Sequence, residues 1–271
     1  MGTRFTNPMR RKLREGQPCF GIFVTFDDPT VTEVAVRSGL DWICVDMEHG
    51  HLDYRDLLNH LRAAHGSDLT VLSRVPTTSV DHVKRTLDLG AHGVVLPLIG
   101  NAEELRQGMA FGRYPPVGVR GLSNMRAADY GPMIAEYVAV ADDETMIIPI
   151  IETVEASRNI DEILAVQGLE AVFFGPADLS QSYGHRAVWE GPGVAEDILR
   201  MAGLASERGI ASAIMGLDVA DIDRRLEQGF QIVGVGSDVY LLMKQMSEFA
   251  GRYKNADTRL AFNQDPKPAA G

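Results

Sequence analysis

The sequence predicts an α/β protein with a single domain folded as a (β/α)₈ barrel, the TIM barrel, and three observations support this prediction. First, eight short apolar runs recur along the chain, with helical patterns between them. Second, the 271 residues are close to the roughly 250 that one such barrel needs. Third, several of the runs stop at charged residues, and these barrels carry their chemistry at the C-terminal ends of their strands.

The eight apolar runs are the predicted strands. Most of them are apolar without interruption, which is typical of parallel strands that are buried on both faces. Alternating strands and helices predict a parallel sheet, and eight such units predict a closed barrel. The runs are CFGIFVTF (19–26), WICVDMEH (42–49), TVLSRVP (70–76), GVVLPLI (93–99), MIIPIIE (146–152), AVFFGPAD (171–178), ASAIM (211–215) and IVGVGSD (232–238).

The segments between the predicted strands show helical spacing of their apolar residues. Several of them end at a glycine, which favours the left-handed conformation that often follows a helix. One begins at Ser79, a residue type that caps helix N-termini. The predicted helices lie within residues 52–66, 79–91, 101–114, 154–168 and 218–229.

Two segments depart from the repeating pattern. Residues 114–132, YPPVGVRGLSNMRAADYGP, are rich in turn residues and lie between strands four and five. A loop of this length is usually functional, so we expect it to cover the substrate at the barrel mouth. Its Arg120 and Arg126 either read a distal carboxylate or form surface ion pairs. We assign residues 1–255 to the barrel domain and 256–271 to a flexible tail, or to a segment swapped onto a neighbouring subunit.

Composition and charge indicate the kind of partner. The net charge is −11, and an acidic chain repels phosphate backbones, so we expect no nucleic acid partner. No apolar run approaches the roughly 20 residues of a membrane span. The only cysteines, Cys19 and Cys44, lie inside apolar runs and are predicted to be buried free thiols. These features favour a cytoplasmic enzyme that acts on small molecules.

Two carboxylates are the predicted metal ligands. Glu152 ends the fifth strand, and Asp178 ends the sixth. Both are therefore expected at the barrel mouth, with room beside them for waters and substrate. Oxygen ligands of this kind suit Mg²⁺ or Mn²⁺.

The ends of strands two and three supply the predicted acid–base groups. His49 can act as a general base near neutral pH, and Asp46 could hold the tautomer of its imidazole. Arg74 stays charged and can stabilise a developing oxyanion. Glu48 is expected to support these groups rather than to bind the metal. No lysine lies at a predicted strand end, so an enolate formed here needs a metal, not a Schiff base, as its electron sink.

Five segments carry a family resemblance. DMEHG, SRVP, YPPVGVRG, IETVEA and GPADLS occur in this order, and on them the chain from about residue 10 to 250 resembles the HpcH/HpaI aldolase family, the class II pyruvate aldolases. The resemblance implies a (β/α)₈ barrel, a divalent ion (Mg²⁺, Mn²⁺ or Co²⁺) and no organic cofactor. It also implies a homohexamer, built as a trimer of dimers or a dimer of trimers.

The resemblance supports the roles given above and adds further site residues. It implies that the backbone N–H groups of Ala177 and Asp178 bind the substrate carboxylate, and that Ser123 lies beside the substrate. Asp88 matches an acid that is contributed across a subunit interface. One position departs from the family: Ile150 stands where many members have glutamine, so a hydrogen bond to water or substrate is absent there.

The expected function is reversible cleavage of 4-hydroxy-2-oxo acids to pyruvate and an aldehyde, through a metal-bound enolate. One alternative is a CoA-thioester lyase of the citrate-lyase-β type, or another enolate-forming barrel enzyme. A second alternative is a non-catalytic protein that binds a metal and a keto acid. The aldehyde partner stays open.

Overall fold

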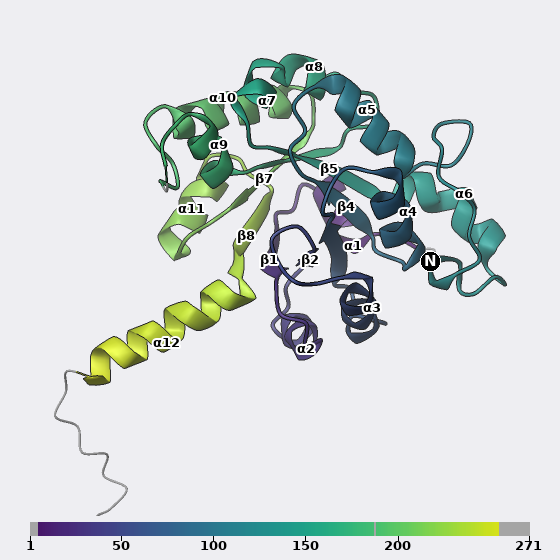
Figure 1. Ribbon diagram of the computed structural model, residues 1–271, viewed down its shortest axis with the longest axis horizontal. Helices are drawn as coiled ribbons and strands as arrows, with labels where there is room; N and C mark the ends of the chain where they lie inside the picture. Colours follow the sequence, from purple (N-terminus) through teal and green to yellow (C-terminus); the bar gives the residue numbers. More distant parts are fainter. Residues whose placement is uncertain (1–4, 187, 255–271) are drawn as a thin grey trace, which may run out of the picture.

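The computed structural model describes residues 5–186 and 188–254, and it contains a closed barrel of eight parallel strands in sequence order (Figure 1). Each predicted strand is present, which confirms the predicted fold. Most observed strands end before their predicted ends, because residues such as Glu48 leave the sheet and form the mouth loops. The strands are β1 (Cys19–Val24), β2 (Trp42–Asp46), β3 (Thr70–Arg74), β4 (Gly93–Leu96), β5 (Met146–Ile151), β6 (Ala171–Phe174), β7 (Ala211–Met215) and β8 (Ile232–Ser237).

The helices surround the barrel, and several of them begin at a residue whose side chain accepts a backbone N–H. Asp53, Ser79, Asn101 and Asp218 all cap helices in this way. Among the described residues, no helix has the length and apolar character needed to cross a membrane. The helices are α1 (Pro8–Arg14), α2 (Thr30–Arg37), α3 (Tyr54–Ala63), α4 (Val80–Asp88), α5 (Ala102–Phe111), the 3₁₀ turn η1 (Arg126–Ala128), α6 (Ile134–Glu144), α7 (Val154–Arg158), α8 (Ile160–Leu164), α9 (Pro176–Ser182), α10 (Val194–Glu207), α11 (Val219–Glu227) and α12 (Asp238–Lys254).

Side chains fill the barrel interior, so the barrel is a packed core and not a channel. The ring of Phe23 meets the rings of Trp42 and Phe173 edge to face. A Cβ atom at Gly21 would lie 2.2 Å from the Trp42 ring, so only glycine leaves room for this tryptophan. Met9 of α1 is fully buried in the same cluster and closes the end of the barrel opposite the mouth.

The long segment between α5 and α6 does not cover the barrel mouth, and that prediction is wrong. The predicted helix 101–114 forms α5, which carries the chain from the mouth to the opposite end before the loop begins. There Arg120 donates to Asp88 at the end of α4, at 2.9 Å. Arg126 donates to the carbonyl oxygens of Leu89 and Leu61, at 2.9 and 3.0 Å. Both arginines thus hold the loop against the barrel, and neither reads a substrate at this chain's mouth.

The last helix, α12, leaves the barrel instead of packing along it (Figure 1). Its first residue, Asp238, accepts hydrogen bonds from the backbone N–H groups of Thr25 and Phe26. Beyond this anchor the helix exposes many large apolar side chains. The predicted tail, 256–271, lies outside the described residues. The exposed apolar residues of α12 are Val239, Tyr240, Leu241, Leu242, Met243, Met246, Phe249 and Tyr253, each at least 40% exposed.

Candidate active site

A cavity of about 360 Å³ opens at the C-terminal ends of the strands. Strands from several parts of the chain bring the predicted charged residues together there, as expected for a parallel barrel. Ile150, the position that departs from the family, also lines this cavity and is buried. The predicted site residues whose side chains line this cavity are Asp46, His49, Arg74, Glu152 and Asp178.

Glu152 follows β5 directly and is only 3% exposed. One carboxylate oxygen accepts the backbone N–H of Leu98 at 2.7 Å, and Leu98 adopts a left-handed conformation to present it. A Cβ atom at Gly175 would lie 2.9 Å from the Cβ of Glu152, so glycine allows the β6 end to approach this side chain. Burial, together with repulsion from Asp178 and Glu48, raises the pKa of Glu152 to about 7.

Asp178 lies in the first turn of α9, just after β6, the strand that pairs with β5, and it is exposed. Repulsion between two carboxylates near one cavity disfavours their joint ionisation, and a cation between them would remove that cost. The described residues contain no group of three or more His, Cys, Asp or Glu that could hold a metal. Asp178 contributes to the raised pKa of Glu152, and two such carboxylates fit an ion that takes its other ligands from waters and substrate, as Mg²⁺ often does.

The raised pKa of Glu152 predicts a pH dependence of metal binding. Below about pH 7 this carboxyl group is protonated, and a proton must leave before the oxygen can bind a cation. The affinity for Mg²⁺ or Mn²⁺ should therefore fall about tenfold per pH unit below that pKa, and level off above it. Calorimetric titrations between pH 5.5 and 8 measure this. An affinity that stays constant over this range would exclude Glu152 as a ligand.

Arg74 is held by two acids, Asp46 and Glu48. Its Nε and Nη2 atoms donate to the carboxylate of Asp46 at 2.9 and 2.5 Å, and its Nη1 lies 3.2 Å from Glu48. Burial alone would raise the pKa of Asp46, but the hydrogen bonds and charge of Arg74 hold that pKa below its ordinary value. A guanidinium has five N–H groups, so one remains free on each terminal nitrogen. Arg74 is thus fixed in place and can still donate to a substrate oxygen.

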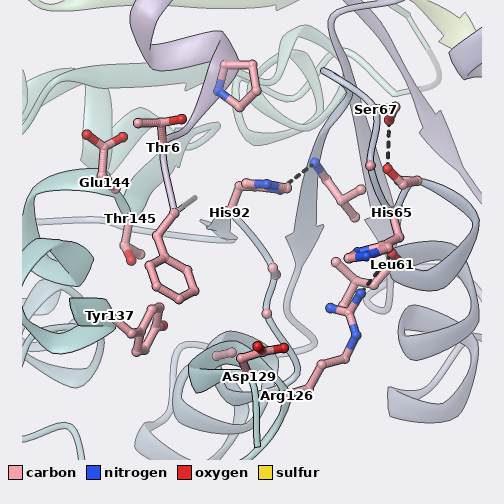
Figure 2. A pocket seen from close by; sticks show the side chains of 18 of the residues that line it. Thr6, Leu61, His65, Ser67, His92, Arg126, Asp129, Tyr137, Glu144 and Thr145 are labelled. Atoms are coloured by element: carbon pink, nitrogen blue, oxygen red, sulfur yellow. Dashed lines mark hydrogen bonds between the residues drawn. The ribbon is translucent and has the colours of Figure 1, made fainter. Parts of the chain in front are cut away.

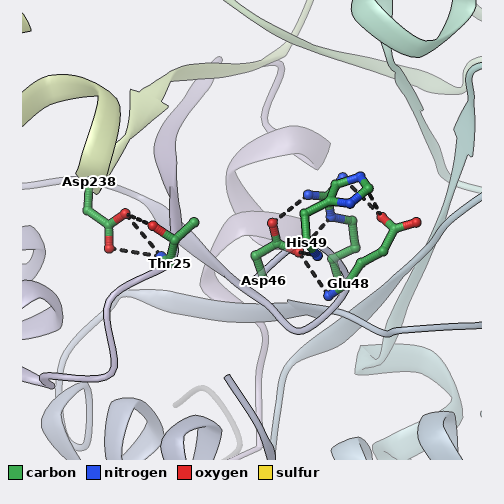
Figure 3. A network of polar contacts seen from close by, with 6 residues as sticks. Thr25, Asp46, Glu48, His49 and Asp238 are labelled. Atoms are coloured by element: carbon green, nitrogen blue, oxygen red, sulfur yellow. Dashed lines mark hydrogen bonds and ion pairs between the residues drawn. The ribbon is translucent and has the colours of Figure 1, made fainter. Parts of the chain in front are cut away.

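His49 does not pair with Asp46 in the way the sequence suggested. Asp46 accepts the backbone N–H groups of Glu48 and His49, and its oxygens are otherwise used by Arg74. The imidazole of His49 is 61% exposed, and its Nε2 lies 3.6 Å from Glu48 instead. Asp46 therefore orients the arginine, and Glu48 is the acid beside the histidine. Figure 3 shows Glu48 and His49 close together on the chain that follows Asp46, the last residue of β2.

Three further residues were expected near the substrate, and they lie in different places. Ala177 lines the mouth, and its N–H belongs to the first turn of α9, where such groups have no partner within the helix. Asp88 ends α4 and pairs with Arg120 at the opposite end of the barrel. Ser123 lies in the loop beside it, where its hydroxyl accepts the N–H of Met125. Neither Asp88 nor Ser123 reaches the mouth of its own chain.

Sequence reasoning missed the apolar wall of the cavity, formed by Trp189, Leu217 and Tyr240. Trp189 lies in the loop between α9 and α10, Leu217 follows β7, and Tyr240 lies in the first turn of α12. Leu217 and Tyr240 follow the last two strands, whose ends were given no role in the sequence analysis. The sequence could have indicated these residues, because a large apolar or aromatic residue occurs in the segment after each of the strands β6, β7 and β8.

A second, larger cavity of about 810 Å³ lies at the opposite end of the barrel (Figure 2). Its polar groups are largely used within the protein. His92 accepts the N–H of Val71, Arg126 donates to two carbonyl oxygens, and Ser67 donates to the carbonyl of Ala64. Enzymes of this fold carry their catalytic groups at the C-terminal face, so the smaller cavity is the candidate active site.

Known proteins resemble the chain over most of its length. A family model described as HpcH/HpaI aldolase/citrate lyase matches residues 19–245. A hydroxypyruvate/pyruvate aldolase of Pseudomonas aeruginosa is 34% identical over 249 residues, which is 92% of this chain and 93% of that protein. A 5-keto-4-deoxy-D-glucarate aldolase of Escherichia coli O157:H7 is 33% identical over 250 residues, with 92% and 98% covered.

A solved structure agrees with these sequence matches. The HpcH/HpaI aldolase of Desulfitobacterium hafniense aligns with a TM-score of 0.86 and 32% identity, over 91% of this chain and 96% of that one. An HpcH/HpaI aldolase/citrate lyase family protein of Burkholderia cenocepacia aligns with a TM-score of 0.87 and 29% identity, over 92% and 100%. The likeness therefore extends over the whole barrel and is not confined to a motif.

Proposed function

The chain belongs to the HpcH/HpaI aldolase/citrate lyase family and is an aldolase; from this premise we propose that it reversibly cleaves 4-hydroxy-2-oxo acids to pyruvate and an aldehyde. The main support for this proposal is the set of charged residues at the barrel mouth. It combines two acids suited to a cation, Glu152 and Asp178, with a fixed arginine and a histidine. That set can bind a 2-oxo acid and handle both the negative charge and the proton of an aldol cleavage.

The family is metal-dependent. We assign Glu152 and Asp178 as the metal-binding residues of this chain, and their oxygens suit Mg²⁺, Mn²⁺ or Co²⁺. When bound, the ion supplies a Lewis acid that polarises a carbonyl oxygen. We propose no organic cofactor.

The remaining residues bind and orient the substrate. The N–H groups of Ala177 and Asp178 have no partner within α9, and we assign them to the substrate carboxylate. The free N–H groups of Arg74 donate to the 2-oxo oxygen, where negative charge develops as the C3–C4 bond breaks. Asp46 and Glu48 hold the guanidinium still, so no reorganisation is needed at that moment.

His49 serves as the general base. It removes the proton of the C4 hydroxyl group, directly or through a water, while the C3–C4 bond breaks and the aldehyde leaves. Glu48, at 3.6 Å from Nε2, stabilises the imidazolium that results. We therefore propose that His49 is the general base and Glu48 its acidic partner, and that Asp46 acts through Arg74.

The two alternative functions are less well supported. A CoA-thioester lyase needs basic residues for the CoA phosphates, but Arg74 is the one basic residue, apart from His49, among the described residues that line the mouth. A protein that only binds a keto acid has no need of a histidine beside an acid. The relatives named above are aldolases.

The test is an assay of pyruvate release from a series of 4-hydroxy-2-oxo acids, with the metal removed by EDTA and then restored as Mg²⁺ or Mn²⁺. We expect release only with metal. A CoA-thioester substrate is the parallel control. Cleavage of that substrate without pyruvate release would contradict the proposal.

We propose that the chain forms a homo-oligomer, with the hexamer implied by the resemblance as its full form. The support is the surface of α12, whose eight apolar side chains are at least 40% exposed, because contiguous exposed apolar surface marks an interface. In such an assembly Asp88 and Ser123, which lie far from their own mouth, could reach a neighbour's mouth. The cytoplasm remains the proposed location.

Polar substitutions on α12 should dissociate the oligomer. We expect the wild type to have several times the 29.6 kDa mass of one chain by light scattering. The triple variant Leu242→Ser, Met246→Ser, Phe249→Ser should have the mass of a smaller species. The control is Leu199→Ser, a 37% exposed residue on α10. A wild type with the mass of one chain would contradict self-association.

A further inference from the structure

The turn between β4 and α5, residues 97–101, contains a residue in an uncommon backbone conformation. Leu98 has a φ of 55°, in the left-handed region, which costs free energy for a residue with a Cβ atom. Such a conformation persists only where the surrounding structure holds it, and it often occurs at functional sites. A plain connection between a strand and a helix does not require it.

The conformation of Leu98 directs its N–H at the carboxylate of Glu152. The N–H donates to Oε1 at 2.7 Å, and in the part of the chain that the structure describes this is the only hydrogen bond that the carboxylate accepts. β4 pairs with β5, so the two strand ends lie side by side. The other oxygen, Oε2, lies against Gly175, where an added Cβ atom would come within 3.0 Å of it. The hydrogen bond therefore orients the carboxylate and leaves Oε2 for a cation.

Two side chains from outside the mouth hold the turn, and both bind Gly100, two residues after Leu98. The N–H of Gly100 donates to Oε2 of Glu104 at 2.8 Å, and its carbonyl oxygen accepts a hydrogen bond from Nδ2 of Asn159 at 2.9 Å. Ile99, between Leu98 and Gly100, is 1% exposed and belongs to the core. The chain directly after Leu98 is therefore fixed by burial and by hydrogen bonds.

Asn159 is the more distant of these two side chains along the sequence. It lies between α7 and α8, and α8 packs beside α5 (Figure 1). Its side chain does not cap α8, and among the described residues its one hydrogen bond is the bond to Gly100. It does not line the mouth cavity. The contacts from Asn159 through the turn to Glu152 all lie within one chain, so no neighbouring subunit is needed to form them.

We propose that Asn159 is a positioning residue for metal binding: it holds Gly100, which keeps Leu98 in the left-handed conformation, and the N–H of Leu98 keeps the Glu152 carboxylate turned toward the mouth. This inference rests on the proposed function, which assigns Glu152 as a metal-binding residue. A group that is oriented before binding loses less freedom when it binds. Loss of a partner that orients a metal ligand typically costs about 10–100-fold in metal affinity.

The first test is Asn159→Ala, measured by calorimetric titration of metal-free protein with Mn²⁺. We expect the dissociation constant for Mn²⁺ to rise at least about tenfold. Asn59→Ala is the matched control, because the Asn59 side chain also makes one hydrogen bond, from Arg62 on α3 at 3.3 Å. Thermal unfolding checks that both variants are folded.

A second measurement separates positioning from a general loss of structure. Exchange of the pyruvate methyl protons for deuterium, followed by NMR, reports enolate formation without any aldehyde. In Asn159→Ala the Mn²⁺ concentration for half-maximal exchange should rise about tenfold. The exchange rate at saturating Mn²⁺ should stay within about threefold of the wild-type rate, because Glu152 is then held by its bond to the ion. A more widely damaged site would lose the maximal rate instead.

The N–H of Leu98 can be removed by itself. An ester in place of the amide between Pro97 and Leu98 lacks the donor and keeps the leucine side chain, together with any contact of that side chain with a neighbouring subunit. The Mn²⁺ affinity should fall about as much as in Asn159→Ala. An ester at Val219 is the control, because its N–H lies in the first turn of α11 and donates to none of the described residues.

Glycine at position 98 should rescue the loss. Glycine adopts the left-handed conformation without a steric cost, so the turn then depends less on Asn159. The double variant Asn159→Ala, Leu98→Gly should recover part of the Mn²⁺ affinity, whereas Leu98→Val in the same background should lower it further. A substitution that merely loosened the protein would not be repaired by glycine. These variants also decide the question where the ester protein does not fold.

The outcomes separate the inference from the proposed function. Weaker Mn²⁺ binding in Asn159→Ala, with rescue by glycine, supports the inference. Unchanged affinity in folded Asn159→Ala, with affinity lost in Glu152→Ala, overturns the inference and leaves the metal site intact. Weaker binding in Asn159→Ala with normal binding in the ester protein also overturns it, since Leu98 then has no part. Absence of metal-dependent exchange in the wild type overturns the proposed function.

Discussion

Replacing Glu152 with alanine is expected to abolish binding of the divalent metal and to lower the rate of aldol cleavage by at least about 10³-fold. The expectation follows from the position of this carboxylate. It is 3% exposed, its orientation is fixed by the N–H of Leu98, and it faces the mouth that also contains Asp178. With one of two protein ligands removed, the remaining carboxylate of Asp178 is exposed and cannot hold the ion alone.

The variant should remain folded. Burial raises the pKa of Glu152, which means that its charged form is destabilised in the protein, so its removal relieves a cost. Calorimetry with Mn²⁺ measures the lost affinity, and thermal unfolding checks the fold. Glu162→Ala, an exposed residue on α8, is the matched control. Unchanged metal affinity in a folded Glu152→Ala protein would remove this residue from the metal site.

Replacing Arg74 with methionine is expected to lower kcat by about 10²–10³-fold, the usual effect of losing one group that stabilises an oxyanion. Unlike Glu152→Ala, this change should also lower stability. Asp46 is 3% exposed and would lose both hydrogen bonds from the guanidinium, leaving a buried charge without its partner. Breaking a buried pair in this way costs about 3–5 kcal/mol.

The two effects of Arg74→Met can be separated. Chemical denaturation gives the free energy of unfolding, and kcat is measured under conditions where the variant is folded. Arg74→Lys keeps a charge but cannot make the paired hydrogen bonds to Asp46, so it should recover only part of the rate. Arg208→Met is the control, because Arg208 forms a partly exposed pair with Asp161. A normal kcat in folded Arg74→Met would exclude Arg74 from the mechanism.

Most of the fold could be predicted because its signal is local. Eight apolar runs are long enough to show which segments are buried on both faces, and the spacing of apolar residues identified the helices between them. The ends of those runs also identified Glu152, Asp178 and Arg74. In a parallel barrel the chain order alone places all strand ends on the same face.

The position of the long loop was predicted wrongly because the loop, which follows β4 in the sequence, was assumed to lie near the end of β4 in space. One helix, α5, separates the two and carries the chain to the other end of the barrel. The pairing of His49 with Asp46 was misjudged for a similar reason. Arg74 lies on the neighbouring strand, directly opposite Asp46 in the β2–β3 register, and takes the carboxylate first.

The sequence by itself determined the closed barrel, the two acids and the arginine at its mouth, since each depends on patterns within about ten residues. Only the tertiary structure decided which acid lies beside His49, where Asp88 and Ser123 lie, and that α12 leaves the barrel. It also brought Trp189, Leu217 and Tyr240 together around the mouth cavity. These features depend on side chains that are distant in the chain competing for the same partners and the same space, and no local pattern records the outcome of that competition.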